Sequence, residues 1–174
     1  MMITYTVTNG VKRWHNENGE LHRLDGPAMV NGPAIEGAKS DKYWFQNDKL
    51  HRLDGPAIEY ANGDKSWYQN GKRHRLDGPA VEFNNSDKYW FQNDKRHRLD
   101  GPAVEYADGG KEWWVNGELH RLDGPAVELH NGRKEWWVED TQYSEEQFLA
   151  KIESMNRPCK GKKVTVEGVE YTLA

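Results

Sequence analysis

The sequence has one cysteine and no long run of apolar residues. Cys159 alone cannot form a disulfide within the chain or a cysteine-based zinc site, so a reducing, cytoplasmic location is expected. No stretch approaches the roughly 20 apolar residues of a transmembrane helix. The N-terminal MMITYTVTNG lacks the basic and apolar blocks of a signal peptide. The sequence therefore predicts a cytoplasmic protein with no transmembrane segment.

Aliphatic side chains and net charge are also scarce. Only 30 of the 174 residues are Leu, Ile, Val or Phe, but eight Trp and eight Tyr add large rings that disordered chains lack. Aromatic residues must therefore supply much of the apolar area that folding buries. The net charge of −4 gives no basic surface for nucleic acid, which is not an expected partner.

A motif of seven residues, HRLDGPA, occurs five times. It begins at His22, His51, His74, His97 and His120, and the last three intervals are each 23 residues. The first interval is 29 residues because six extra residues lie near positions 29–34. A fixed period of this length is typical of repeat architectures, whose units stack on their neighbours. The period predicts an array over residues 1–140 with six Trp-bearing units.

Each unit contains two turn signals between short runs of alternating residues. A pair such as Asn62-Gly63, flanked by β-like runs, is the strongest short-range signal for a hairpin with a type I′ turn. A second pair, such as Asn70-Gly71, is expected to open a longer connection to the next strand. Two strands per unit predict an all-β fold, a single elongated, twisted antiparallel meander of β-hairpin repeats of about 23 residues.

The expected turn also predicts which side chains share a face. A two-residue loop at Asn62-Gly63 pairs Ile58 with Trp67, so the first Trp of each unit packs in an aliphatic layer. The opposite face then carries the second aromatic residue of each unit, interleaved with glutamates. These residues are Phe45, Tyr68, Phe91, Trp114 and Trp137, with Glu59, Glu82, Glu105 and Glu128.

Residues 141–174 break the pattern, and no sixth HRLDGPA follows. Ser144 and Gln147 form the pattern of a capping box ahead of an apolar stripe, which predicts a helix over about 145–155. Alternation around Glu167-Gly168 predicts a hairpin over about 163–173. An array of strands ends in an unpaired edge, so this helix and hairpin are expected to cap it.

The spacing Trp-x-x-Asn-Gly-x-x-His, as from Trp67 to His74, resembles the MORN repeat over roughly residues 4–140. The resemblance implies stacked β-hairpins in a twisted sheet with a groove, use as a protein-interaction scaffold and, for some members, phospholipid binding. The units differ from MORN repeats because Arg, not Gly, follows each His. The HRLDGPA form is similar to repeats of bacterial, phage and large-virus proteins, which implies a viral protein that binds and blocks a host factor.

The second aromatic row and its glutamates are the first candidate site. An exposed aromatic row usually marks an interface, and the glutamates favour a protein partner whose Lys or Arg side chains would stack on the rings. A copy of the same chain, giving a homo-oligomer, is a second candidate for this face. Packing within the chain and a small aromatic or nucleotide ligand are the alternatives.

The repeated His and Arg residues are the second candidate. Equivalent residues sit two strands apart, about 10 Å, too far for one metal ion with bonds of about 2.1 Å, so neither a metal nor another cofactor is expected. Arginine rows bind anions, which gives an alternative anion site at Arg52, Arg75, Arg98, His51, His74 and His97. The Asp two residues after each Arg favours a structural role instead.

The motifs of common enzyme classes do not occur in the sequence. There is no P-loop, nucleophile elbow, HExxH or dinucleotide fingerprint, and a repeated loop lacks the asymmetric group of residues that catalysis needs. The sequence predicts a non-catalytic protein-binding or scaffold module and no enzyme. A sequestrant of a nucleotide or other anionic ligand and peripheral phospholipid binding are the alternatives.

Overall fold

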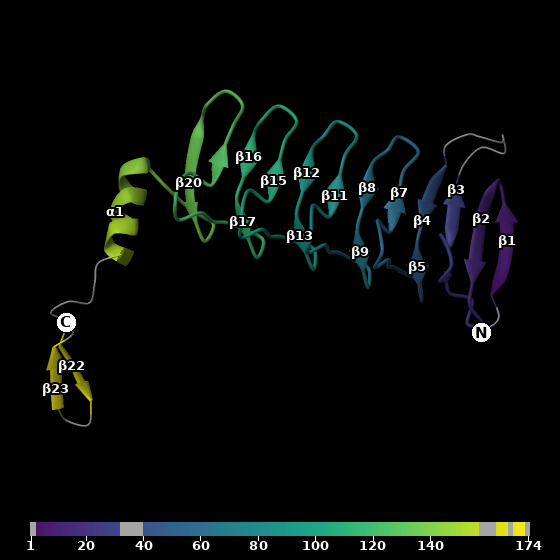
Figure 1. The fold of residues 1–174 in the computed structure, drawn as a ribbon, viewed down its shortest axis with the longest axis horizontal. Helices are drawn as coiled ribbons and strands as arrows, with labels where there is room; N and C mark the ends of the chain where they lie inside the picture. Colours follow the sequence, from purple (N-terminus) through teal and green to yellow (C-terminus); the bar gives the residue numbers. More distant parts are fainter. Residues whose placement is uncertain (1–2, 32–39, 157–162, 167–168, 173–174) are drawn as a thin grey trace.

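The structure is a computed structural model that describes residues 3–31, 40–156, 163–166 and 169–172. Its main feature is a long antiparallel sheet of 13 short strands (Figure 1), which confirms the predicted all-β meander. Residues 32–34 of the predicted insertion near 29–34, and Cys159, lie outside the described residues. The strands of the sheet are β1 (Thr4–Thr8), β2 (Val11–His15), β3 (Met29–Asn31), β4 (Asp41–Tyr43), β7 (Ile58–Glu59), β8 (Lys65–Ser66), β11 (Val81–Glu82), β12 (Lys88–Tyr89), β15 (Val104–Glu105), β16 (Lys111–Glu112), β19 (Val127–Glu128), β20 (Lys134–Val138) and β21 (Thr141–Tyr143).

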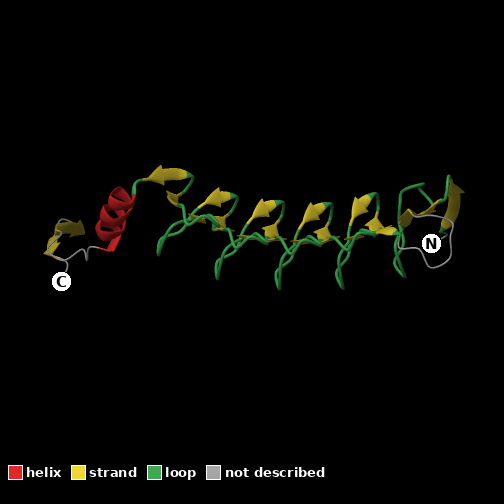
Figure 2. Ribbon diagram, turned by 90° about the horizontal axis from the view of Figure 1, so that it is seen from above, coloured by secondary structure: helices red, strands yellow, loops and turns green. Residues whose placement is uncertain are grey.

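Four units also contain a second, smaller hairpin, which lies below the main sheet in Figure 1. These hairpins are β5–β6 (Phe45–Gln46, Lys49–Leu50), β9–β10 (Tyr68–Gln69, Lys72–Arg73), β13–β14 (Phe91–Gln92, Lys95–Arg96) and β17–β18 (Trp114–Val115, Glu118–Leu119). Such a unit therefore contributes four short strands where two were predicted. Seen from above, the strands lie in one line and a row of loops projects from one side of it (Figure 2).

The second turn signal of each unit closes the small hairpin. Asn70 and Gly71 have φ values of 52° and 80° and connect Gln69 to its strand partner Lys72. Positive φ at both positions of a two-residue loop defines the type I′ turn. The predicted longer connection at this pair is therefore wrong, because the chain turns back at once.

The loop at the first turn signal, Asn62-Gly63, contains three residues and not the predicted two. The N–H of Tyr60 donates to the carbonyl of Asp64 across residues 61–63. Within that loop only Gly63 has a positive φ, 99°. A three-residue loop with glycine in the left-handed region is another common hairpin connection, and it shifts the strand register by one residue.

This register moves the tryptophans to the other face of the sheet. Glu59 pairs with Lys65 and Ile58 pairs with Ser66, so the predicted pairing of Ile58 with Trp67 is wrong. Because side chains alternate, Trp67 lies on the side of Glu59 and not on the aliphatic side. The next three hairpins keep this register. The aliphatic side retains a buried row, Ile58, Val81, Val104 and Val127.

Aspartate side chains join the tips of neighbouring main-sheet hairpins. Oδ1 of an aspartate in one unit accepts a backbone N–H of the next unit, in the pairs Asp41–Ala61, Asp64–Asn84 and Asp87–Ala107, at 2.7 to 2.8 Å. Gly110 takes the place of the aspartate in the following unit. Without a side chain it cannot accept this bond, and at that tip Nδ1 of His130 instead lies 3.3 Å from Oδ2 of Asp108.

The sheet continues three residues past the predicted end of the array. Strand β21 pairs with β20 through a two-residue turn at Glu139-Asp140, where both φ values are positive. Helix α1 (Glu145–Asn156) confirms the predicted helix. The N–H of Ser144 donates to Oε1 of Gln147 at 3.0 Å, and the N–H of Gln147 donates to Oγ of Ser144 at 3.2 Å. These two bonds are the predicted capping box.

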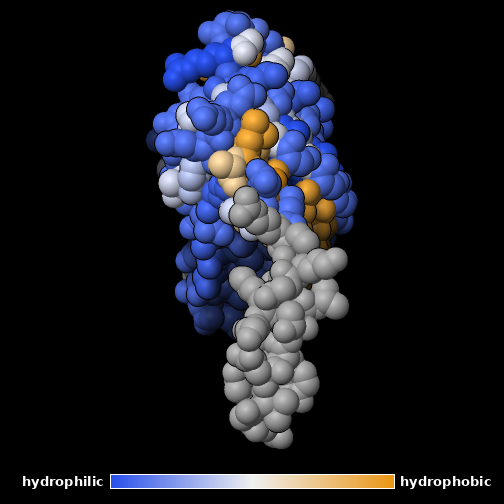
Figure 3. Space-filling model, turned by 90° about the vertical axis from the view of Figure 1, so that its left-hand side faces the viewer, coloured by the Kyte–Doolittle hydropathy of each residue, from blue (hydrophilic) through white to orange (hydrophobic). Residues whose placement is uncertain are grey.

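The C-terminal part presents little apolar surface. Viewed from the α1 end, the surface is mainly hydrophilic with a small apolar area (Figure 3). Phe148 of α1 is buried, whereas Leu149 and Met155 are exposed. Strands β22 (Lys163–Val166) and β23 (Val169–Thr172) pair as the predicted hairpin, whose turn lies outside the described residues. No helix among the described residues is long and apolar enough to cross a membrane.

Candidate binding surface

The glutamates of the first candidate site are neutralised within the chain. Glu59 stands opposite Lys42 on one neighbouring strand and Lys65 on the other. Its Oε1 accepts a hydrogen bond from Nη1 of Arg52 at 3.1 Å. Lysines flank the other three glutamates in the same way, Glu82, Glu105 and Glu128. Cross-strand pairs of opposite charge stabilise a sheet, so these carboxylates already have partners.

The second aromatic row lies on the aliphatic side, so the structure does not bring it together with those glutamates. Nε1 of Trp114 donates to Glu112, which pairs across the sheet with Val104. Phe91 is only 6% exposed, and the other four rings are partly buried. Packing within the chain, one of the predicted alternatives, accounts for much of this row.

Arginines of the chain itself stack on two rings of this row. Cζ of Arg73 lies 4.1 Å from the centre of the Phe91 ring, and Cζ of Arg96 lies 4.9 Å from that of Trp114. A cation at this distance over a ring is attracted by the electrons of its face. The cationic groups that we expected from a partner are therefore supplied here by the small hairpins.

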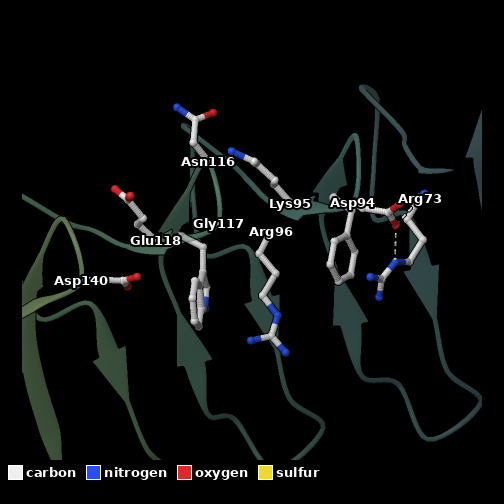
Figure 4. Close-up of a pocket in the computed structure, with 10 residues that line it drawn as sticks. Arg73, Asp94, Lys95, Arg96, Asn116, Gly117, Glu118 and Asp140 are labelled. Atoms are coloured by element: carbon white, nitrogen blue, oxygen red, sulfur yellow. Dashed lines mark hydrogen bonds and ion pairs between the residues drawn. The ribbon is translucent and has the colours of Figure 1, made fainter.

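A groove of 610 Å³ opens beside these stacked pairs (Figure 4). Nε of Arg73 donates to Oδ1 of Asp94 at 2.9 Å. Gly117 occupies the position of Asp94 in the next unit, which leaves Arg96 without that partner. Nη1 of Arg96 lies 3.8 Å from Oε2 of Glu112. Both signs of charge line this groove, so it does not favour an anionic ligand.

The arginine of each HRLDG loop is held by contacts inside its own unit. Nε of Arg75 donates to Oδ1 of Asp77 at 2.9 Å. Its Nη1 donates to the carbonyl of Pro79 at 3.2 Å and to Oε1 of Glu82 at 3.1 Å. The guanidinium also covers Trp67, with Cζ 4.1 Å from the ring centre. The same contacts recur at Arg52, Arg98 and Arg121.

A glycine makes room for this guanidinium, and the guanidinium in turn acts on an aspartate. A Cβ atom at Gly78 would lie 2.9 Å from Cζ of Arg75, so any larger residue would force the guanidinium out of this position. The hydrogen bond from Arg75, followed by its charge, lowers the pKa of Asp77. The pKa of the corresponding aspartate is lowered in every loop, at Asp25, Asp54, Asp100 and Asp123. These aspartates are therefore ionised, and their side chains are 79 to 85% exposed, whereas those of the arginines are at most 23% exposed.

The repeated histidines join one unit to the next. Nδ1 of His51 lies 3.1 Å from Oδ1 of Asn70, and the backbone N–H of Asn70 donates to it at 3.2 Å. His74 makes both contacts with Asn93, and Nδ1 of His97 accepts the backbone N–H of Asn116 at 3.1 Å. Among the described residues, no three His, Cys, Asp or Glu side chains lie close enough together to hold a metal ion.

The leucine of each HRLDG loop is left in contact with solvent. Leu24 is 70% exposed, Leu53 and Leu76 are 76% exposed, Leu99 is 80% and Leu122 is 41% exposed. The aspartate that follows each leucine is also exposed. We did not predict this row from the sequence. Its signal is an apolar residue between two charged ones in a loop that occurs five times.

Grooves lie between successive HRLDG loops. The groove between residues 52–55 and 74–77 has a volume of 550 Å³ and is lined by Trp67, Gln69 and the leucines of both loops. Equivalent grooves of 470 and 520 Å³ are lined by Trp44 and Trp90. Volumes of this size are typical of ligand pockets. We call this row of leucines, aspartates and grooves the loop edge.

Comparison with known proteins adds no further constraint. No protein-family model matches the chain, and no curated protein sequence matches it significantly.

Proposed function

We propose that the chain is a non-catalytic protein-binding module of MORN-like repeats, and that it binds its partner at the loop edge. The exposure of one leucine in each of five HRLDG loops carries this proposal. A single exposed leucine is ordinary, whereas a repeated row of them beside grooves is typical of an interface. A cytoplasmic phage protein that blocks a host factor would use such a surface.

The proposal moves the interface away from the first candidate site. The glutamates there are paired with lysines and arginines of the chain, and two aromatic rings are covered by its arginines. The aspartates of the loop edge are also paired with arginines, but their side chains are 79 to 85% exposed, against 32 to 36% for those glutamates, and they lie beside exposed leucines. The units of this edge offer the same groups five times, which suits an elongated partner and supplies no asymmetric set of groups for catalysis.

A photo-crosslinking amino acid placed at Leu76 tests this proposal. We expect it to capture a partner protein in cells, and we expect the same residue at Leu149 of α1 to capture none. The matched control is sound because Leu149 is also exposed, at 60%, but lies outside the loops.

The affinity of the captured partner provides the second half of the test. Substitution of three loop leucines together, Leu53→Asn, Leu76→Asn and Leu99→Asn, should weaken binding at least tenfold, because each buried leucine side chain contributes about 1.5 to 3 kcal/mol. Leu149→Asn should leave the affinity unchanged. A partner that binds the triple variant as tightly as the unaltered chain would contradict the proposal.

The two alternative functions have less support from the geometry. Nε and Nη1 of the loop arginines are already engaged, as at Arg75, which leaves fewer donors for a nucleotide or other anion. The net charge of −4 argues against peripheral phospholipid binding, because anionic lipids attract basic protein surfaces. A large thermal stabilisation by one nucleotide, or flotation with anionic liposomes, would favour the corresponding alternative.

A further inference from the structure

The loop edge has a repeat distance that can be compared with that of a partner. Each unit contributes two strands to the sheet, so equivalent grooves lie about 9.6 Å apart, twice the strand spacing of about 4.8 Å. A polyproline II helix advances about 9.3 Å per turn of three residues. An α-helix advances about 10.5 Å over seven residues. Over the four intervals between five loops the mismatch reaches about 1 Å for polyproline II and about 4 Å for the α-helix.

The polar lining of the grooves also favours a polyproline II backbone. The side-chain amide of Gln69 lines its groove and makes no hydrogen bond within the described part of the chain. Gln46 and Gln92 line the equivalent grooves. A polyproline II helix has no internal hydrogen bonds, so its carbonyls are free to accept these donors. The carbonyls of an α-helix are already bonded along the helix.

The apolar and charged groups of the loop edge determine the side chains of such a partner. Each groove is lined by a tryptophan and two leucines, as in the groove of Trp67, Leu53 and Leu76, and the guanidinium of Arg75, which covers one face of the Trp67 ring, lines the same groove. Aromatic-lined grooves of this kind accept the apolar residues of a polyproline II segment, which face the same side at every third position. Asp54 and Asp77 line the same groove, each bonded to the arginine of its own loop, but the aspartate side chains are 84% exposed and those of Arg52 and Arg75 only 21 and 22%, so a partner meets the carboxylates first, and these favour Lys or Arg.

We infer that the occupant of the loop edge is a polyproline II segment of a partner protein, with proline or another apolar residue at every third position and Lys or Arg beside it. This inference rests on the proposed function and specifies the conformation and charge of the partner. A second copy of the chain fits less well, because its own loops would place a second row of aspartates against the first.

Two synthetic peptides provide the test. The probe is (Pro-Pro-Arg)5, and its matched control is (Pro-Pro-Pro-Arg)5, which has the same charge and the same backbone conformation but a period of four. We expect the full chain to bind the period-three peptide at least tenfold more tightly, measured by fluorescence anisotropy. A polyproline II helix has three residues per turn, so a period of four rotates each arginine by a third of a turn from the one before it. Only one or two arginines of the control peptide can therefore face the aspartates.

Variants of the chain locate the bound peptide. The combination of Leu53→Asn, Leu76→Asn and Leu99→Asn should weaken binding of (Pro-Pro-Arg)5 at least tenfold, and Gln69→Ala should weaken it about threefold. Leu149→Asn should bind as the unaltered chain does. Circular dichroism of each variant checks that the fold is retained.

Several results would overturn the inference. These are equal affinity for the two peptides, tighter binding of an arginine-bearing amphipathic helix, or a dimer in sedimentation that the loop variant abolishes. A partner crosslinked at Leu76 that lacks a polyproline II segment would overturn this inference and leave the proposed function intact. If the period-three peptide binds but no partner protein is captured in cells, the proposed function fails, while the inferred fit of the loop edge to a polyproline II segment is retained.

Discussion

At the scale of single residues, the arginine of each HRLDG loop connects the parts of its unit. Arg75 contacts the aspartate of its own turn, the carbonyl of Pro79, a strand glutamate and the ring of Trp67. A planar guanidinium with several fixed donors can make these contacts together, whereas a lysine ammonium has no such geometry. Because Gly78 lies against the guanidinium, the arginine and the glycine of the motif depend on one another.

This dependence can be measured with a double-mutant cycle. Gly78→Ala should lower the free energy of unfolding by about 1–3 kcal/mol, because the added methyl group displaces the guanidinium of Arg75 from its partners. In an Arg75→Ala background the same change should cost less than about 0.5 kcal/mol, since nothing remains for the methyl group to displace. Urea unfolding of the four proteins gives the coupling energy. Equal costs in the two backgrounds would show that the glycine is needed for another reason.

At the scale of the hairpin, the sequence predicts where the chain turns more reliably than how many residues the turn contains. Asn62-Gly63 and Asn70-Gly71 have the same letters, yet the first lies in a three-residue loop and the second forms a type I′ turn. The bond from Asp41 to the neighbouring Ala61 is not the cause, because the loop at Asn131-Gly132 also holds three residues without such a bond. In the longer loops the asparagine side chain folds back, as Oδ1 of Asn62 accepts the backbone N–H of Asp64, and the letters alone do not distinguish this bond from a type I′ turn.

The one-residue difference in loop length explains most of what we mispredicted about the site. It exchanges the faces of Trp67 and Ser66, and it separates the second aromatic row from the glutamates. The capping box at Ser144 and Gln147 was predictable because all of its atoms lie within one turn of helix. The exposure of Leu76 was not, because it depends on how the loop is held by Arg75.

The bond from Arg73 to Asp94 joins two neighbouring small hairpins, and it can be transferred to the next pair, where Arg96 and Gly117 occupy the same positions. Gly117→Asp should raise the free energy of unfolding by about 1 kcal/mol. The new carboxylate would accept bonds from the backbone N–H and Nε of Arg96, as Asp94 does from Arg73. Asp94 has a φ of 65°, so an aspartate tolerates the left-handed conformation at this position.

Thermal unfolding would measure this gain, and Arg96→Leu provides its control. In that background the gain should fall by about half, since only the backbone donor remains. A loss of stability in Gly117→Asp would show that the glycine is required by the backbone.

At the scale of the whole molecule, the units are joined almost entirely to their neighbours. Strand pairing, the tip aspartates and the histidine contacts all connect one unit to the next. The stability of such an array is approximately a sum of unit and interface contributions. The chain should therefore tolerate the loss of a whole unit better than the loss of a few residues.

Excision of residues 82–104 tests this expectation, because it joins Val81 to Glu105 and restores the strand pattern of β11. We expect a folded protein with a lower midpoint and a lower urea m-value, which scales with the surface exposed on unfolding. Excision of residues 82–103 leaves one extra strand residue, which reverses the faces of that strand and should prevent cooperative folding. Circular dichroism and urea titration distinguish the two, and similar behaviour of both proteins would contradict the expectation.

The glycine at position 110 makes the array mechanically uneven. A tensile force applied to the two ends acts on every junction between hairpins in series. Three of these junctions resist it with strand pairing and a bond from an aspartate to the backbone at the tip, while at the junction between β16 and β19 the tip contact joins two exposed side chains, Nδ1 of His130 and Oδ2 of Asp108, at 3.3 Å. A contact between two exposed side chains is weaker than a bond to the backbone, so this junction is more compliant than those three, and under load the sheet extends there before it extends at any of them.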